Sequence, residues 1–333
     1  MSDETFRAKD AKAPRVMAPP LERPRVLSVQ SLCVRSVVGQ KAAALPLNAL
    51  GFEVDPINTV YLSNHLGYAN GAAGKATTAD ELAAMVDGLK RNGLLGAYTH
   101  VLSGYVGSTA LLDGLVRLLD DLPRDAVYVC DPVLGDHGKF YVPEELVAVY
   151  RERVLPRATM ATPNQFEAEK LTGLKIESLR DALRACDAMH DDLGVRVVVI
   201  SSCVFEACPA GEAALVASIR SAASREDGSG GARRRRFTVR IPLVEGRFSG
   251  AGDLFAALVL GRVMAAEPAP LEESVPRALE LACAAAHAVV RRTREAHVRG
   301  RNPLCELAVV ECVAELLAPV VDPRMRVAEL EQE

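Results

Sequence analysis

The residues best suited to chemistry lie in the last third of the chain, where small residues precede an aspartate. The segment 248–254 reads Phe-Ser-Gly-Ala-Gly-Asp-Leu, and the apolar stretch 254–263 after it predicts a helix. The backbone of Gly250, Ala251 and Gly252 can approach a charged group closely, and amides at a helix N-terminus attract anions. Asp253 would then stand beside an anion site, which suits deprotonation of a hydroxyl during phosphoryl transfer. A Gly-rich turn with an ordinary first-turn aspartate gives the same pattern.

Alternating strands and helices must position this turn. Strands are predicted over residues 25–30, 54–62, 99–103, 126–130 and 195–200. Helices are predicted over residues 80–92, 109–121, 143–153, 164–172 and 179–193, and mainly over 253–318. This order predicts an α/β fold with a doubly wound, mostly parallel central sheet flanked by helices. Ligands of such sheets bind at the carboxyl ends of the strands, so the residues after each strand are the candidates.

Several strands are followed by side chains that could bind a ligand. Ser31 comes after the first strand, and Tyr105, after the strand 99–103, has a ring suited to stacking on a planar ligand. Asp131 and Asp136 follow the strand 126–130. This pair could hold a hydrated Mg²⁺ or could simply close a turn.

The start of the predicted helix 164–172 also carries polar residues. Asn164 and Glu167 have the spacing of a capping box, which is a structural role. Glu167 could also act on a metal-bound water near nucleotide phosphates, and the two roles are compatible. Ser201 and Ser202 lie at the end of the most apolar strand and offer two hydroxyls at the edge of the sheet.

Composition and charge limit the classes of function. The chain has 333 residues, 49% hydrophobic and 25% charged, with a net charge of −4. This is ordinary globular composition, and it gives no general affinity for nucleic acid or an anionic membrane. The 8 cysteines are scattered without a C-x-x-C pair, which favours a reduced, cytoplasmic protein. No apolar run reaches the length of a membrane span, so no membrane association is predicted.

The boundaries of the folded domain can be placed from local composition. Residues 1–24 lack periodicity and predict a disordered tail, residues 25–320 form one domain, and residues 321–333 are a charged tail. The segment 224–236 is rich in glycine and ends in four arginines. A flexible, solvated loop explains it better than a nucleic-acid patch, because no aromatic residues or recognition motif accompany the arginines.

Over residues 25–295 the chain resembles the pyridoxal kinases of the ribokinase-like superfamily. The matching segments occur in order at residues 26–31, 50–55, 63–65, 103–105, 129–136, 162–169 and 250–257. Gly-Ala-Gly-Asp is shared across the superfamily, whereas Ser-Asn-His at 63–65 and Cys-Asp-Pro-Val-Leu-Gly-Asp at 130–136 point to the branch that acts on vitamin B6.

The resemblance implies ATP-dependent phosphorylation of the 5′-hydroxymethyl group of pyridoxal, pyridoxine and pyridoxamine by one ribokinase-like domain, 25–320, that forms a homodimer. Asp253 would be the base, and residues 250–252 would bind the γ-phosphate. Ser31 would hydrogen-bond the pyridine ring, Tyr105 would cover its face, and Leu66 would occupy a vitamer-contacting position.

Cation and nucleotide sites are also implied by the resemblance. Asp136, and Glu167 through water, would serve Mg²⁺, and a monovalent cation (K⁺ or Na⁺) would lie among Asp131, Thr162 and Ser201. The residues implied to line the ATP site are Asn164, Gln165, Phe166, Glu167, Ser201, Ser202, Tyr141, Val244, Glu245, Gly246, Phe248 and Ala251.

The chain departs from the family pattern mainly near the vitamer. Leu66 replaces a hydroxyl residue, mostly Thr, that bonds the vitamer, and residues 35–40 read Arg-Ser-Val-Val-Gly-Gln in place of the family's Arg-Gly-Tyr-Val-Gly-Asn. Ala251 replaces a common Thr, with little effect expected, because a backbone N–H does that work. Because of Leu66, another small-alcohol kinase of the superfamily, such as a hydroxymethylpyrimidine kinase, is an alternative interpretation. A non-catalytic vitamer-binding paralogue is a further alternative, against which the base and the metal ligands argue.

Overall fold

The computed structural model describes residues 23–221, 233–264 and 269–331. A ten-stranded sheet runs through this part of the chain in the order β12-β11-β10-β9-β8-β5-β4-β1-β2-β3. The strands are β1 (Arg25–Cys33), β2 (Glu53–Leu62), β3 (Gly74–Ala76), β4 (His100–Ser103), β5 (Val127–Cys130), β8 (Met160–Ala161), β9 (Val197–Cys203), β10 (Glu212–Arg220), β11 (Arg234–Pro242) and β12 (Ala328–Leu330). A separate small hairpin joins β6 (Gly135–Asp136) to β7 (Lys139–Phe140).

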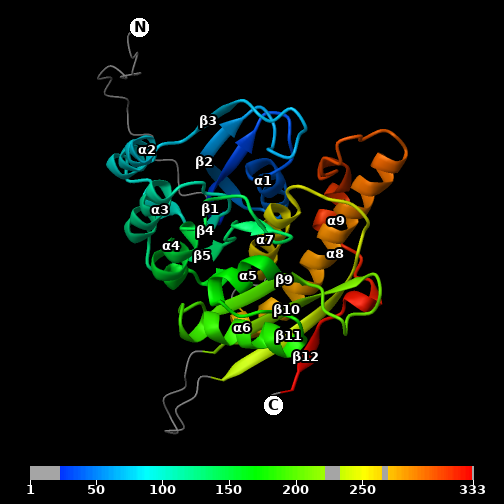
Figure 1. Ribbon diagram of the computed structural model, residues 1–333. Helices are drawn as coiled ribbons and strands as arrows, with labels where there is room; N and C mark the ends of the chain where they lie inside the picture. Colours follow the sequence, from blue (N-terminus) through cyan, green and yellow to red (C-terminus); the bar gives the residue numbers. More distant parts are fainter. Residues whose placement is uncertain (1–22, 222–232, 265–268, 332–333) are drawn as a thin grey trace, which may run out of the picture.

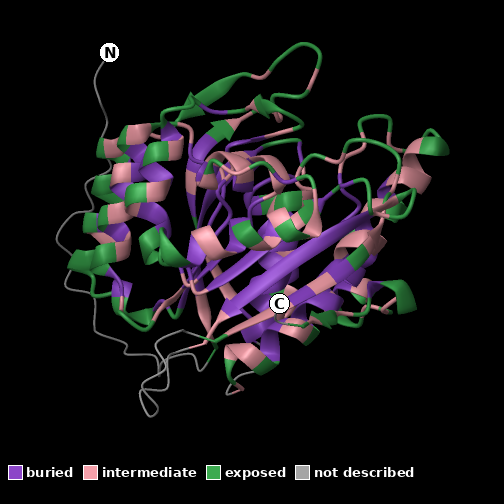
Figure 2. Ribbon diagram, turned by 60° about the horizontal axis from the view of Figure 1, so that its bottom comes forward, coloured by how far each residue is buried: buried purple, intermediate pink, exposed green. Residues whose placement is uncertain are grey.

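The middle of the sheet is parallel, from β2 through β1, β4, β5 and β8 to β9. Strand β3 at one edge, and β10 to β12 at the other, are antiparallel additions. The central strands are buried on both faces, as Figure 2 shows, which is why β9 begins with a continuous run of β-branched residues. The predicted α/β class with a doubly wound, mostly parallel sheet is confirmed.

Helices form a layer on each face of the sheet (Figure 1). One face is covered by α2 (Ala79–Arg91), α3 (Thr109–Asp121), α4 (Leu146–Val149), α5 (Gln165–Thr172) and α6 (Leu179–Asp191). The other is covered by α1 (Gln40–Ala49), α7 (Ala251–Met264), α8 (Leu271–Val298) and α9 (Val313–Leu317). Short 3-10 turns lie at Leu95–Ala97, Leu155–Arg157, Val310–Cys312 and Pro323–Met325, and a π-turn, Tyr150–Val154, follows α4 where one helix over 143–153 was predicted.

Helix α7 lies inside the molecule rather than on its surface. Every residue from Leu254 to Gly261 is buried, and the helix is apolar on all sides, as expected for a helix with no solvent-facing stripe. Its first turn is more accessible, since Gly252 is exposed and Asp253 is partly exposed. The start of α7 is therefore the part that a ligand can reach.

The structure corrects our interpretation of the arginine run. Arg234, Arg235 and Arg236 begin strand β11 and pair with β10, so they are not part of a solvated loop. Their guanidinium groups meet carboxylates at 2.7 Å (Arg234 to Asp187), 2.9 Å (Arg236 to Asp187) and 2.8 Å (Arg235 to Glu329). Long side chains at a sheet edge can lie along apolar surface while their heads find acidic partners. Of the rest of the predicted loop 224–236, residues 224–232 lie outside the described residues.

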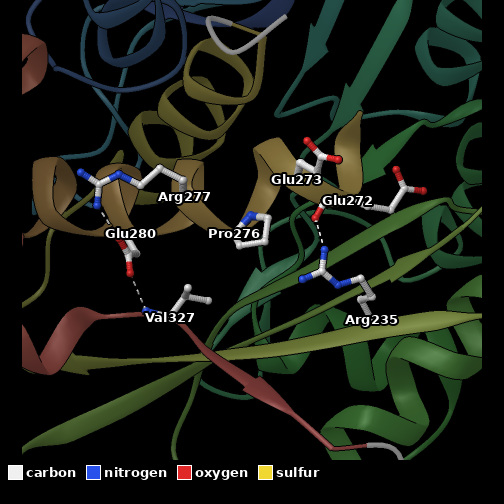
Figure 3. Close-up of a pocket in the computed structure, with 7 residues that line it drawn as sticks. All are labelled: Arg235, Glu272, Glu273, Pro276, Arg277, Glu280 and Val327. Carbon is white, nitrogen blue, oxygen red and sulfur yellow. Dashed lines mark hydrogen bonds and ion pairs between the residues drawn. The ribbon is translucent and has the colours of Figure 1, made fainter. Parts of the chain in front are cut away.

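The structure also corrects the predicted tail 321–333. Residues Ala328–Leu330 form β12, which pairs with β11 at the edge of the sheet. Figure 3 shows how α8 holds this segment from one side of a shallow pocket: Glu280 of α8 accepts the Val327 N–H at 2.9 Å, and Arg235 of β11 donates to the carbonyl of Glu272 at 2.6 Å. The predicted tail 1–24 falls almost wholly on residues 1–22, outside the described part of the chain.

Candidate active site

The register of the parallel strands brings three predicted segments to one edge of the sheet. Ser103 of β4 lies opposite Cys130 of β5, and Cys130 lies opposite Ala161 of β8. The next residues therefore leave the sheet side by side. The N–H of Asp131 donates to Ser103 O at 2.9 Å, and the N–H of Thr162 donates to Cys130 O at 3.0 Å. These hydrogen bonds fix the spacing of the segments after each strand.

The start of α7 faces this edge. A methyl group added at Gly252 would lie 3.7 Å from Oδ2 of Asp131, which is ordinary contact distance. Gly250 has a φ of 88°, and a methyl group there would come within 2.3 Å of the carbonyl oxygen of Val37. Only glycine combines this left-handed conformation with so close an approach of two backbones. The predicted small-residue turn is thus packed between the strand ends and the segment 36–39.

Asp253 has a defined partner and a shifted pKa. Its Oδ2 accepts a hydrogen bond from the N–H of Gly39 at 2.7 Å. Burial raises the pKa of Asp253 to about 6, and the Gly39 hydrogen bond opposes that rise. A carboxylate of this kind is ionised at neutral pH but is basic enough to accept a proton from a positioned hydroxyl.

Gly39 connects Asp253 to Ser31. Its φ is 51°, and a methyl group at Gly39 would come within 2.1 Å of the carbonyl oxygen of Ser31 and 2.3 Å of its Oγ. Ser31 and Asp253 therefore lie on two sides of the same glycine. Sequence reasoning did not single out Gly39, although a glycine directly before the first helical residue, Gln40, was a signal that could have found it.

Buried carboxylates gather behind Asp253. Burial and the charges of Glu167 and Asp253 raise the pKa of Asp131 well above its usual range. Burial likewise raises the pKa of Glu167 to about 8. The Thr162 Oγ1 atom is buried without a hydrogen-bond partner in the described part of the chain, yet it lies near enough to Asp131 to lower that carboxyl's pKa. Burial thus disfavours the charged form of both acids, and a cation bound beside them would favour it.

Glu167 also confirms the predicted capping box. Its Oε2 accepts the Asn164 N–H at 2.9 Å, and Asn164 Oδ1 accepts the Glu167 N–H at 2.9 Å. Its Oε1 accepts the N–H of Leu134 at 3.0 Å and that of Gly135 at 3.4 Å. The structure thus ties the start of α5 to the turn after β5.

Asp136 lies close to this group but is bound locally. Its Oδ1 accepts the N–H of His137 at 2.7 Å. This local hydrogen bond closes the turn, which is one of the two roles that the sequence indicated for Asp136. It is nonetheless near enough to help raise the pKa of Glu167 and of Tyr141, and Arg247 acts on Tyr141 in the opposite direction. Tyr141 and the segment around 247 thus border the same carboxylates.

The residues predicted to line a nucleotide site differ in how the structure uses them. Phe166 stacks edge-on against Phe140, with 5.1 Å between ring centroids. The Gln165 side chain is engaged in the fold, since it accepts the Val204 N–H and donates to Ile176 O. The other predicted residues are placed as follows: Phe248 lies beside Gly246, the backbone N–H of Ser201 donates to Pro163 O, Ser202 is exposed, Val244 lies in the loop after β11, and Glu245 is exposed and pairs with Arg294.

The residues predicted to contact the vitamer are less uniformly placed. Tyr105 is partly buried, and its backbone is held because its carbonyl accepts the Thr59 hydroxyl at 2.6 Å. Leu66 is 65% exposed and stands in the loop between β2 and β3. This exposure places Leu66 at the rim of the candidate site, and no contact among the described residues joins it to Asp253.

In the part of the chain that the structure describes, no group of three or more His, Cys, Asp or Glu side chains is arranged to hold a metal ion. All eight cysteines are free in the structure. Among the described residues, no helix is long and apolar enough to cross a membrane.

Comparison with known proteins identifies the family. Residues 98–297 match the family model described as phosphomethylpyrimidine kinase. A curated pyridoxal kinase of Arabidopsis thaliana is 40% identical over 313 residues, covering 92% of this chain and 95% of that protein. The chain belongs to the pyridoxal kinase family. The pyridoxal kinase of Homo sapiens is 42% identical over 246 residues, covering 72% of this chain and 77% of that protein.

Solved pyridoxal kinases share the fold. The structure from Leishmania donovani in complex with ADP and pyridoxamine superposes with a TM-score of 0.80 at 33% identity, covering 92% of this chain and 99% of that one. A structure of the same protein with ADP and pyridoxine gives the same TM-score and coverage. The resemblance to a ribokinase-like pyridoxal kinase that the sequence motifs predict is therefore confirmed.

Proposed function

We propose that this chain transfers the γ-phosphoryl group of ATP to the 5′-hydroxymethyl group of pyridoxal, pyridoxine and pyridoxamine. The observation that carries the proposal is Asp253, whose carboxylate stands at the accessible start of a buried helix beside a turn of small residues. The relatives add the substrate class, because they are pyridoxal kinases over most of the chain.

The proposed reaction needs one proton acceptor and one anion site. Asp253 takes the hydroxyl proton, the hydroxyl oxygen bonds to the γ-phosphorus, and ADP leaves with the electrons of the broken P–O bond. The backbone N–H groups of Gly250, Ala251 and Gly252 would hold the charge on the transferring group, and the Ala251 N–H would exchange its long 3.3 Å hydrogen bond to Phe248 O for this contact. Ser31 and Tyr105 orient the ring, so that most of the catalysis comes from positioning.

A magnesium ion is part of the proposal. Asp136, and Glu167 through water, are the residues that would hold it. The raised pKa values of Asp131 and Glu167 support a cation here, because a positive charge would favour the ionised form of these buried acids. Mg²⁺ commonly uses one or two carboxylates together with substrate phosphates, which suits a site without a cluster of acidic ligands. When bound, it would neutralise charge on the phosphates.

A monovalent cation, K⁺ or Na⁺, is proposed beside Asp131, Thr162 and Ser201. The buried, unpartnered Thr162 hydroxyl is the observation that supports it. Removal of divalent ions with EDTA should abolish ADP release and added Mg²⁺ should restore it. Replacement of K⁺ and Na⁺ by a bulky organic cation should lower the rate, and an unchanged rate would remove this second ion from the proposal.

A nucleotide site is proposed along α5 and the loop after β11. It would be lined by Asn164, Gln165, Phe166, Glu167, Ser201, Ser202, Tyr141, Val244, Glu245, Gly246, Phe248 and Ala251. Support comes from the shared surroundings of Tyr141, Asp136 and Glu167. Because the Gln165 side chain is bonded within the fold, its contribution would come from its backbone.

Assembly and compartment belong to the same proposal. We expect a homodimer, which light scattering on the purified chain would test against a monomer mass of 35.6 kDa. We expect the cytoplasm, since eight free cysteines suit a reducing compartment.

One assay separates this function from its nearest alternative. ADP release is measured with each of the three vitamers and with hydroxymethylpyrimidine, which the family model's description and Leu66 keep as a second candidate. We expect turnover with the vitamers at a kcat/KM well above that for hydroxymethylpyrimidine. The reverse order would replace the proposed substrate, and no ADP release with any alcohol would contradict the kinase activity.

A further inference from the structure

Glu306, in the segment after α8, contacts two loops that border the candidate site. Its side chain is only 15% exposed. Its Oε2 accepts the N–H of Val37 at 2.7 Å, and its Oε1 accepts the hydroxyl of Tyr68 at 2.6 Å. The Nε2 atom of His65 lies 3.7 Å from the same Oε1. Hydrogen bonds to a carboxylate are stronger than those between neutral groups, so this contact is a firm one.

The two loops held by Glu306 also hold each other. The Ser36 Oγ accepts the N–H of His65 at 3.0 Å, and the rings of His65 and Tyr68 meet edge-on at 4.8 Å. The first loop continues to Gly39, whose N–H binds Asp253. The second carries Leu66, at the rim. A single carboxylate thus connects the loop that contacts the base with the loop that borders the vitamer.

Glu306 itself is fixed from several sides. Asn302 accepts the Glu306 N–H at 3.1 Å and donates to the Glu306 carbonyl at 2.6 Å. Cys305, just before it, has a φ of 52°, a conformation that costs a residue other than glycine about 1–3 kcal/mol and persists only where the surroundings impose it. On the other side, Leu307 Cδ1 lies 3.3 Å from where a methyl group on Gly250 would stand.

We propose that Glu306 is a positioning residue of the kinase. It holds the segment 36–39 so that the Gly39 N–H meets Asp253, and it fixes the segment 63–71 beside the vitamer. Its effect reaches the base through Val37 and Gly39 rather than by contact with the reacting atoms. This inference rests on the proposed function, because it assigns Glu306 to the vitamer side of that reaction.

The kinetic test uses three variants and a control. Glu306→Ala removes the contacts of this side chain with Val37, Tyr68 and His65. Glu306→Gln keeps one acceptor oxygen, and Tyr68→Phe removes only the hydroxyl group that donates to Glu306. Glu311→Gln, an exposed glutamate five residues along the chain, is the matched control. We expect Glu306→Ala to lower kcat/KM for pyridoxal by about 10- to 100-fold, the span for losing hydrogen bonds to a charged group, with smaller losses for the other two. KM for ATP and the control should stay within about twofold of wild type, inside the scatter of a surface substitution.

A second readout does not depend on turnover. Amide hydrogen exchange at Gly39, without substrates, should be faster in Glu306→Ala and Tyr68→Phe than in wild type, and unchanged in Glu311→Gln. Should Glu306→Ala not fold, Glu306→Gln and Tyr68→Phe carry both measurements. Wild-type kcat/KM and wild-type exchange in these variants would overturn the inference. An equal loss for ATP and pyridoxal with a lowered Tm would also overturn it, as a general structural role.

The two proposals fail in different ways. If wild type releases no ADP with any vitamer, the proposed function fails, whereas exchange at Gly39 still reports whether Glu306 fixes that segment. If wild type is active and the variants match it in both measurements, the function stands and only the role of Glu306 is lost.

Discussion

The proposed phosphoryl end of the candidate site and its proposed ring end are built from different kinds of structure. At the phosphoryl end, Asp131 and Thr162 leave adjacent parallel strands in fixed register and face the first turn of the buried helix α7. At the ring end, Gly39 and Leu66 lie on loops, and Leu66 is 65% exposed. The departures from the family pattern at Leu66 and at residues 35–40 lie at the ring end. The remaining one, Ala251, changes a side chain at a position where the backbone N–H is proposed to bind the ligand. Strand register tolerates little change, whereas loops accept substitutions at low cost.

The largest expected effect comes from removing the base at the phosphoryl end. Asp253→Asn should lower turnover by about 10²–10⁴-fold, the usual span for a general base, while ATP still binds. The measurement is coupled ADP release together with ATP binding by calorimetry. Asp80→Asn is the matched control, because Asp80 is also an acidic residue in the first turn of a helix but lies on the exposed surface. An unchanged rate in Asp253→Asn would remove it from this role.

A smaller but still large effect is expected where the two ends meet. Gly250→Ala would place a methyl group within 2.3 Å of Val37 O in a left-handed conformation, so turnover should fall at least about tenfold and stability by about 1–3 kcal/mol. Gly138→Ala is the control, since Gly138 has a φ of 75° but open space around it. Urea unfolding and turnover are measured on both. Equal losses in the two variants would mean that backbone strain, and not the close approach, is responsible.

The pH dependence should report the surroundings of Asp253. Because its pKa is raised to about 6, kcat/KM should fall about tenfold per pH unit below that value, as the base becomes protonated.

An acid whose pKa rises on folding favours folding most at low pH and loses that contribution as the pH passes the folded-state pKa. Asp253→Asn should therefore have a higher Tm than wild type near pH 8, with the gap closing toward pH 5. A gap that widens toward low pH would contradict the raised pKa.

The smallest effect is expected at the rim of the ring end. Leu66→Thr should lower KM for pyridoxal by about tenfold or less, the worth of one hydrogen bond, with kcat nearly unchanged. Leu94→Thr, at another exposed leucine, is the control. A KM that stays the same or rises would show that Leu66 does not mark a missing contact, and the ring would then be held mainly by Ser31 and Tyr105.

The arrangement of segments around the start of α7 could be predicted from the sequence because its signals are local. The turn before α7, the Asn164–Glu167 capping box and the segments after β4 and β5 each appear as a short motif, and the rule that ligands meet at strand ends brings them together. The fold class was predicted separately, from the alternation of strands and helices. Segments near the end of the chain were harder, since Arg234–Arg236 look like a polar loop until their acidic partners on α6 and β12 are known.

The contacts at the ring end could not be predicted, because they join residues far apart in the sequence. Nothing near Gly39 indicates that its N–H meets Asp253, and nothing near Glu306 indicates that it binds Val37 and Tyr68. Helix α1 was also missed, since it contains Pro46 and only a weak apolar stripe. A loop that takes its shape from distant partners leaves no periodic pattern of its own.

The hydrogen bond from Gly39 to Asp253 spans 214 positions of the chain, and that from Val37 to Glu306 spans 269. Neither can form before these distant parts of the chain have met. A partly folded intermediate would therefore leave Asp253, the proposed base, without its hydrogen bond from Gly39. Recovery of turnover during refolding should accordingly lag behind recovery of helical signal, which makes enzyme activity the strictest gauge of complete folding in this kinase.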